Sequence, residues 1–187
     1  MKTSIIQKTF RELYGQPCWG IDHCRWFNLW INFGKPSLRI REPYETKSKS
    51  EFIRRGARQR RISLVGQWTL NLFCCYWSLS TAGVLLASSS SSARRVQKAV
   101  LHLQGESLVS VRINPKIGAT RFDFDLGSVL DCRRFEKDSQ DDLWTLYKPN
   151  GYVLSVQGNG TYCHGPGSQS PRDWHFRSIG PEDVSAI

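Results

Sequence analysis

Five arginines within eight residues form the part of this sequence best suited to chemistry, in the run Arg54-Arg55-Gly56-Ala57-Arg58-Gln59-Arg60-Arg61. Guanidinium groups are planar forks of N–H donors, and they bind carboxylates and phosphates. Residues 35–61 carry ten basic and three acidic residues. We therefore predict a partner-binding surface here. Its candidate residues are Arg39, Arg41, Lys47, Lys49, Arg54, Arg55, Arg58, Arg60 and Arg61.

The distribution of charge points to the same region. Residues 1–103 carry 17 Lys and Arg against 5 Asp and Glu, a net charge of +12, whereas residues 104–187 carry 9 against 11, a net charge of −2. An acidic protein and a nucleic acid both fit a basic face, and Tyr44 and Phe52 could stack on bases. No nucleic-acid-binding motif surrounds these residues. An acidic protein partner is therefore the first hypothesis, nucleic acid is the second, and a solvated segment without a partner is the third.

Three carboxylates form a second group of candidate functional residues. Asp123 and Asp125 alternate along one face of a predicted strand, and Asp131 follows across a turn. Such carboxylates can bind a divalent cation or transfer protons. Acidic residues that alternate with Phe122 and Phe124 are also typical of the solvent side of a half-buried strand, and the pattern favours that interpretation.

Histidine and cysteine could also carry chemistry, but their spacing indicates none. His23 is close to Cys18 and Cys24, and His164 follows Cys163, yet neither group matches a zinc site or a redox motif. Neighbouring residues of a strand point to opposite faces, so His164 is badly placed to activate Cys163. The serine-hydrolase elbow, the phosphate loop and the dinucleotide fingerprint are missing. We expect a non-enzymatic protein without metal or cofactor, and a small enzyme is the most distant alternative.

The six cysteines also bear on the compartment. Residues 1–14 lack the continuous apolar stretch of a signal peptide. The cysteine spacings match no disulfide framework. We therefore expect six reduced thiols and a cytoplasmic location.

A long uncharged stretch, Ile62–Ala93, allows two interpretations. Arginines flank it on both sides, as they flank many membrane-spanning helices. Within it, however, polar residues alternate with Trp68, Leu70 and Leu72, and period-two alternation marks a half-buried strand. We predict a strand over Ile62–Trp77 and no membrane partner, with a spanning helix as the alternative.

The elements that position these residues are organised by an internal repeat. Three segments align in order with three later ones: 7–16 with 97–106, 29–34 with 122–127, and 68–70 with 144–146. The predicted domains are repeat one at 1–87 with a basic insertion at about 46–61, a flexible serine linker at 88–92, repeat two at 93–163, and an irregular C-terminal tail at 164–187. We predict an α+β, β-rich fold in which two diverged helix-plus-β-hairpin repeats pack as one compact protein.

Each repeat should begin with a helix that a glycine ends, and hairpins should follow. The predicted helices cover 3–13 and 92–103. The predicted hairpins pair 26–33 with 37–41 around Gly34-Lys35-Pro36, 121–126 with 129–133, and 143–148 with 152–157 around Pro149-Asn150-Gly151.

The repeated pattern of a helix, Leu-x-Gly, a strand ending in Phe33-Gly34 or Leu126-Gly127, and a strand led by Trp68 or Trp144 resembles small uncharacterised bacterial two-repeat β-rich families. Some of those families are similar to immunity proteins of toxin–immunity systems. The resemblance implies a binding protein, immunity-like or regulatory, and it implies no catalytic residue.

Overall fold

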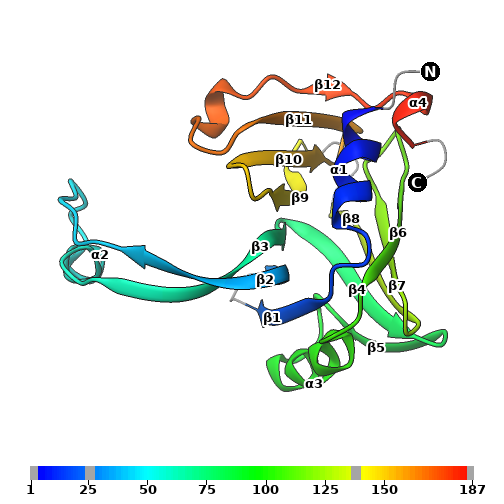
Figure 1. The fold of residues 1–187 in the computed structure, drawn as a ribbon, viewed down its shortest axis with the longest axis horizontal. Coiled ribbons are helices and arrows are strands. Elements are labelled where there is room, and N and C mark those ends of the chain that lie inside the picture. The colour runs from blue at the N-terminus through cyan, green and yellow to red at the C-terminus, as the bar shows by residue number, and fades with distance from the viewer. Residues whose placement is uncertain (1–3, 24–27, 136–139, 185–187) are drawn as a thin grey trace.

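Two antiparallel β-sheets dominate the computed structural model, which describes residues 4–23, 28–135 and 140–184 (Figure 1). The seven-stranded sheet consists, in spatial order, of β1 (Cys18–His23), β2 (Leu29–Arg41), β3 (Arg61–Leu72), β9 (Asp142–Tyr147), β10 (Tyr152–Gln157), β11 (Thr161–Pro166) and β12 (Arg177–Ser178). The five-stranded sheet consists of β5 (Val84–Ser88), β4 (Cys75–Thr81), β8 (Ser128–Arg134), β7 (Thr120–Phe124) and β6 (Leu108–Ile113). The expected α+β, β-rich class is confirmed.

The two longer helices end where the sequence predicts and begin one or two residues later than predicted. In α1 (Ile5–Leu13), the Ser4 hydroxyl accepts a hydrogen bond from the backbone N–H of Gln7. In α3 (Ala93–Leu103), Ser92 accepts from the N–H of Arg95 in the same way. The predicted apolar stripe of α3 is buried as a whole: Val96, Ala99, Val100 and Leu103. A glycine with positive φ follows each helix, because this left-handed turn disfavours a side chain.

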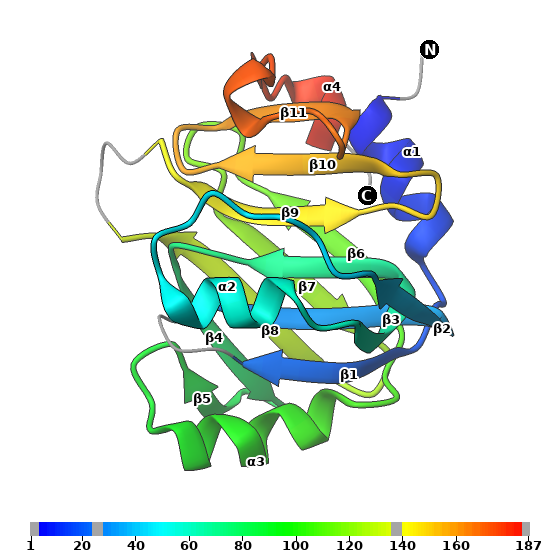
Figure 2. The ribbon, with the colours of Figure 1, turned by 90° about the vertical axis from the view of Figure 1, so that its left-hand side faces the viewer.

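The core lies between the two sheets, whose strands cross at an angle in Figure 2. Its largest cluster joins α1, β7 and β9. Trp144, fully buried, contacts Phe10 and Phe122 edge to face, with ring centroids 5.7 and 5.9 Å away. The indole N–H of Trp144 donates to the hydroxyl of Thr120 at 2.8 Å, so the polar atom of this large side chain is satisfied inside the core.

The single strand predicted over Ile62–Trp77 is divided between β3 and β4, and the rest of the uncharged stretch contains β5. Trp68, Leu70 and Leu72 of β3 are buried in the core. The strand then ends, because the chain turns at Cys74, where φ is +50°, and crosses to the other sheet as β4. Among the residues that the structure describes, no helix has the length and apolar character needed to cross a bilayer.

β2 and β3 extend beyond their neighbours as a two-stranded ribbon. β1 pairs with β2 only as far as Phe33, and β9 pairs with β3 only as far as Thr69. The ribbon continues from the pair Pro36–Gly66 to the pair Arg41–Arg61. It projects from the body, with the short helix α2 (Glu51–Ala57) at its tip (Figure 1). We call residues 35–66 the arm.

The predicted hairpin around Gly34-Lys35-Pro36 is wrong. Residues 29–41 form one strand, and the register shifts by a bulge between Phe33 and Pro36. Gly34 has φ +73° and supplies the bulge conformation, so a Gly-Pro signal typical of a turn marks instead the point where the arm leaves the body. Trp26 and Phe27, which that hairpin included, lie outside the described residues.

Gly66 faces this bulge, and its replacement tests the geometry of the junction. A Cβ at Gly66 would lie 2.7 Å from the carbonyl oxygens of both Phe33 and Trp68. We expect Gly66→Ala to lower the free energy of unfolding by roughly 1–3 kcal/mol, as overpacking does. Gly165→Ala is the matched control, because its nearest neighbour would be 3.6 Å away. Equal denaturation midpoints for the two variants would contradict the bulge.

The serine segment and the tail are more ordered than their composition suggests. Ser91 accepts a hydrogen bond from the N–H of Ser88 at 3.0 Å, so residues 88–91 form a bonded turn before α3. In the tail, β12 pairs with β11. The helix α4 (Pro181–Val184) lies beside α1, where the Gln7 side chain donates to the carbonyl of Glu182 at 2.9 Å.

Candidate functional site

All nine arginines and lysines predicted to bind a partner lie on the arm and are exposed. Two lie on β2, five lie in α2 or in the segment from α2 into the start of β3, and two lie in the loop before α2. The structure thus brings together, on one projection, residues that the sequence spreads over 23 positions from Arg39 to Arg61. The arm projects away from the body, so these residues are accessible to a partner (Figure 1).

The tip of the arm is held by a few specific contacts. The N–H of Tyr44 donates to the carbonyl of Ala57 at 2.9 Å, and Ala57 is buried. The guanidinium of Arg41 donates to the carbonyl of Gly56 and lies over the Tyr44 ring, 5.1 Å from its centroid. These contacts fix α2 against the end of the ribbon, so Arg41 has a structural role beside its charge.

Positive charge on the arm exceeds what its own acids can neutralise. Ten basic and three acidic residues give it a net charge of +7. Arg54 pairs with Glu51 at 2.6 Å and Arg60 with Glu42 at 2.9 Å, both in solvent, where such pairs stabilise a fold little. Within the described part of the chain, no carboxylate lies within ion-pair distance of Arg39, Arg55, Arg58 or Arg61.

One face of the ribbon is apolar and uncovered. In the register of the two strands, Leu38 lies opposite Leu64, and Ile40 lies opposite Ile62. These four side chains are 56–67% exposed. Cross-strand partners share a face, so the four form one continuous apolar strip, while arginines occupy the other face. The sequence analysis missed this strip, although the period-two alternation of residues 38–41 and 61–64 carried the signal.

Two of the three predicted carboxylates, Asp123 and Asp131, form ion pairs with arginines. Arg112 and Arg121 both donate to Asp123, at 2.9 Å, and the Arg121 guanidinium lies 3.6 Å from Asp131. Partial burial tends to raise the pKa of Asp123, but the hydrogen bonds from these arginines outweigh burial, so its pKa is lowered. Asp125 accepts from the N–H of Ser107 instead. In the described chain, no three His, Cys, Asp or Glu side chains converge as a metal site would need.

Histidines and thiols do not assemble either. His23 lies on β1 and His164 on β11, on strands at opposite sides of the seven-stranded sheet. The five cysteines that the structure describes are unbridged, and Cys24 lies outside the described residues. The Cys18 thiol donates to the carbonyl of Leu103, and burial raises its pKa to about 12. Such a thiol stays protonated and is no nucleophile at neutral pH.

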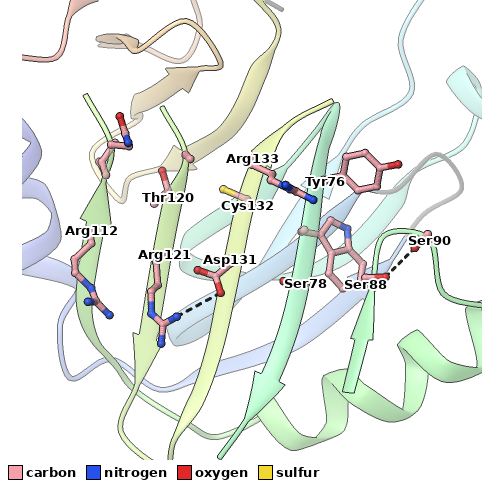
Figure 3. Close-up of a pocket in the computed structure, with 14 residues that line it drawn as sticks. Tyr76, Ser78, Ser88, Ser90, Arg112, Thr120, Arg121, Asp131, Cys132 and Arg133 are labelled. Atoms are coloured by element: carbon pink, nitrogen blue, oxygen red, sulfur yellow. Dashed lines mark hydrogen bonds and ion pairs between the residues drawn. The ribbon is translucent and has the colours of Figure 1, made fainter. Parts of the chain in front are cut away.

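A pocket of about 580 Å³ lies on the outer face of the five-stranded sheet (Figure 3). Its floor includes one row of paired residues that crosses all five strands: Arg112, Arg121, Asp131, Ser78 and Ser88. Tyr76 and Arg133 form the next pair on this face of β4 and β8. Of the aspartates and histidines considered for catalysis, Asp131 lines the pocket, whereas Asp123, Asp125, His23 and His164 do not. The sequence analysis did not identify this site.

Comparison with protein-family models, with curated proteins and with solved structures found no match for this chain.

Proposed function

We propose that this is a non-enzymatic binding protein that uses the arm to hold an acidic partner protein. The observation that carries the proposal is the apolar strip of Leu38, Ile40, Ile62 and Leu64 beside an excess of seven positive charges. The exposed arginines steer an anionic surface and accelerate its approach. The strip gains free energy only from a partner that covers it with apolar groups of its own.

This combination favours a protein over a nucleic acid. Phosphates and sugars can neutralise the arginines, but they offer little apolar surface to four aliphatic side chains. An immunity-like or regulatory protein in the cytoplasm, binding an acidic toxin or enzyme, is one case of the proposed function. The pattern of repeats that resembles immunity proteins supports that case.

Replacing Arg54, Arg55, Arg58, Arg60 and Arg61 by serine tests the role of charge. The side chains are exposed, so we expect the melting temperature to remain within a few degrees of the parent. The probe is a fluorescent acidic peptide with a stripe of leucines. At low salt, we expect the variant to associate with it at least tenfold more slowly in stopped-flow measurements. A folded variant that binds the probe at the parental rate would overturn the proposal.

A matched variant tests the strip at constant charge. Leu38, Ile40, Ile62 and Leu64 are all changed to threonine, which favours strands equally well. We expect its association rate at low salt to stay close to that of the parent and its dissociation rate to rise. The same peptide with serine in place of leucine should show no difference between parent and threonine variant.

Nucleic acid is the second candidate, because a two-stranded ribbon fits the major groove of duplex DNA and this ribbon is strongly basic. A short duplex of mixed sequence serves as the probe. Tighter binding to the duplex than to the leucine-striped peptide at physiological salt, with a steep salt dependence, would favour this candidate.

We also propose that the chain consists of two diverged copies that exchange strands. Hydrogen bonds around the two helix ends support this: the N–H of Gly15 donates to the carbonyl of Leu108, and the N–H of Gly105 donates to the carbonyl of Cys18. These pairs are related by the offset of 90 residues seen in the sequence. β3 of the first copy pairs with β9, and β8 of the second pairs with β4.

This scheme changes one of the predicted alignments. Trp144 lies opposite Leu72, and Leu146 opposite Leu70, where β9 meets β3. The same Trp-x-Leu pattern occurs where β4 meets β8. There, Trp77 lies opposite Cys132, and Leu79 lies opposite Leu130. The counterpart of Trp144 is therefore Trp77, and the alignment of Trp144 with Trp68 is set aside.

A further inference from the structure

We propose that the pocket on the outer face of the five-stranded sheet binds a small organic anion with one phosphate or carboxylate group, and that Arg133 is its main anchor. The pocket volume of about 580 Å³ lies within the range of small-ligand sites. The site is separate from the arm, which extends from the other sheet on the far side of the core (Figure 1).

The charges around the pocket leave one positive charge over. Two of its three arginines, Arg112 and Arg121, are held by the carboxylates of Asp123 and Asp131 at 2.9–3.6 Å. These four groups balance. Arg133 has no carboxylate within ion-pair distance among the described residues, so the charges of these described groups sum to +1.

Arg133 is positioned to receive an oxyanion. Its guanidinium lies over the ring of Tyr76, 5.7 Å from the centroid, and Tyr76 packs edge to face against Phe135 at 4.6 Å. A guanidinium that is held over a ring keeps its N–H edge free for two parallel hydrogen bonds to a carboxylate or phosphate. In Figure 3, Arg133 and Tyr76 lie together at one end of the lining.

The remaining lining suits the neutral part of a polar molecule. The hydroxyls of Ser78 and Ser88 both donate and accept hydrogen bonds, and Ser88 and Ser90 lie within 2.9 Å of each other (Figure 3). The Asp131 carboxylate, between the arginines and the serines in the row, accepts hydrogen bonds. A hydroxylated organic anion therefore satisfies more of the pocket than inorganic phosphate does.

Titration calorimetry and ligand-detected NMR test the site with four probes: inorganic phosphate, glucose 6-phosphate, benzoate and uncharged glucose. We expect saturable binding of glucose 6-phosphate, weaker binding of phosphate and of benzoate, which lack the hydroxylated part, and none of glucose. Arg133→Ala should weaken the binding at least tenfold, since it removes a charge-assisted pair of hydrogen bonds. Arg133→Lys should recover only part of the affinity, because an ammonium group lacks the planar fork.

Two further variants make the result specific. Arg172→Ala removes the same charge from an exposed position in the C-terminal tail, outside the pocket lining and outside the arm, so it should leave anion binding unchanged. Asp131→Asn removes one negative charge from the pocket and should tighten anion binding, opposite in sign to Arg133→Ala. The proposal is overturned if the parent binds none of the three anions, if Arg133→Ala binds them as the parent does, or if Arg172→Ala weakens their binding equally. None of these outcomes bears on the arm, so the two proposals fail independently.

Discussion

Leu70→Asp should prevent the protein from folding cooperatively. Leu70 is 1% exposed and lies in β3 between Ile31 and Leu146 in the sheet register. An aspartate there would place an unpaired carboxylate in the core, which costs several kcal/mol. The whole stability of a domain is only about 5–15 kcal/mol. Circular dichroism during urea denaturation should show a transition at much lower urea concentration, or none.

The same substitution six residues earlier in the same strand is the control. Leu64 lies on the arm and is 56% exposed, so Leu64→Asp should change the free energy of unfolding by no more than about 0.5 kcal/mol. If the two variants have equal midpoints, either the arm is buried in solution or Leu70 does not face the core.

Trp144→Ala should have the second largest effect. The side chain is fully buried and contacts Phe10 and Phe122, and its N–H is bonded to Thr120. Its removal loses the transfer free energy of an indole and leaves a cavity, which together cost about 3–5 kcal/mol. Differential scanning calorimetry should record a melting temperature lower by about 6–20 °C.

Trp30→Ala is the matched comparison. Trp30 is only partly buried and stacks on Tyr147, with ring centroids 6.2 Å apart. Its loss should lower the melting temperature by less than half as much. A larger effect at Trp30 than at Trp144 would mean that the three-ring cluster is not the centre of the core.

Local signals were sufficient for several elements. The serine cap and the apolar stripe of α3 are close together in the sequence. The Asn150-Gly151 turn is likewise adjacent in the sequence to the two strands that it joins. The pairing of β3 with β9 and of β4 with β8 could not be predicted in this way. Those pairs join residues 47–78 positions apart, and no local pattern specifies which edge a strand selects.

The two candidate sites differ in the same way: the arm could be predicted from local sequence and the pocket could not. The arginines of the arm are clustered in the sequence, so composition alone identified them. Arg112, Arg121 and Arg133 come from three strands, and each reads as an ordinary solvent-facing residue. Only the register of the sheet places them around one pocket. The bulge between Phe33 and Pro36 is a different case. Its Gly-Pro sequence predicts a turn, but in the structure it lies where the arm leaves the body.

The order of the strands in the two sheets determines when each sheet can form during translation. Both sheets draw strands from before and after α3, so neither can be completed from the first half of the chain. When β4 has been synthesised, its partner β8 is still 53 residues from completion, and β9, the partner of β3, is 66 residues from completion. At about 5–20 residues per second, the apolar edges of β3 and β4 wait for several seconds. Unpaired apolar edges of this kind are prone to aggregation, so we expect a truncated chain ending before β8 to aggregate or be degraded.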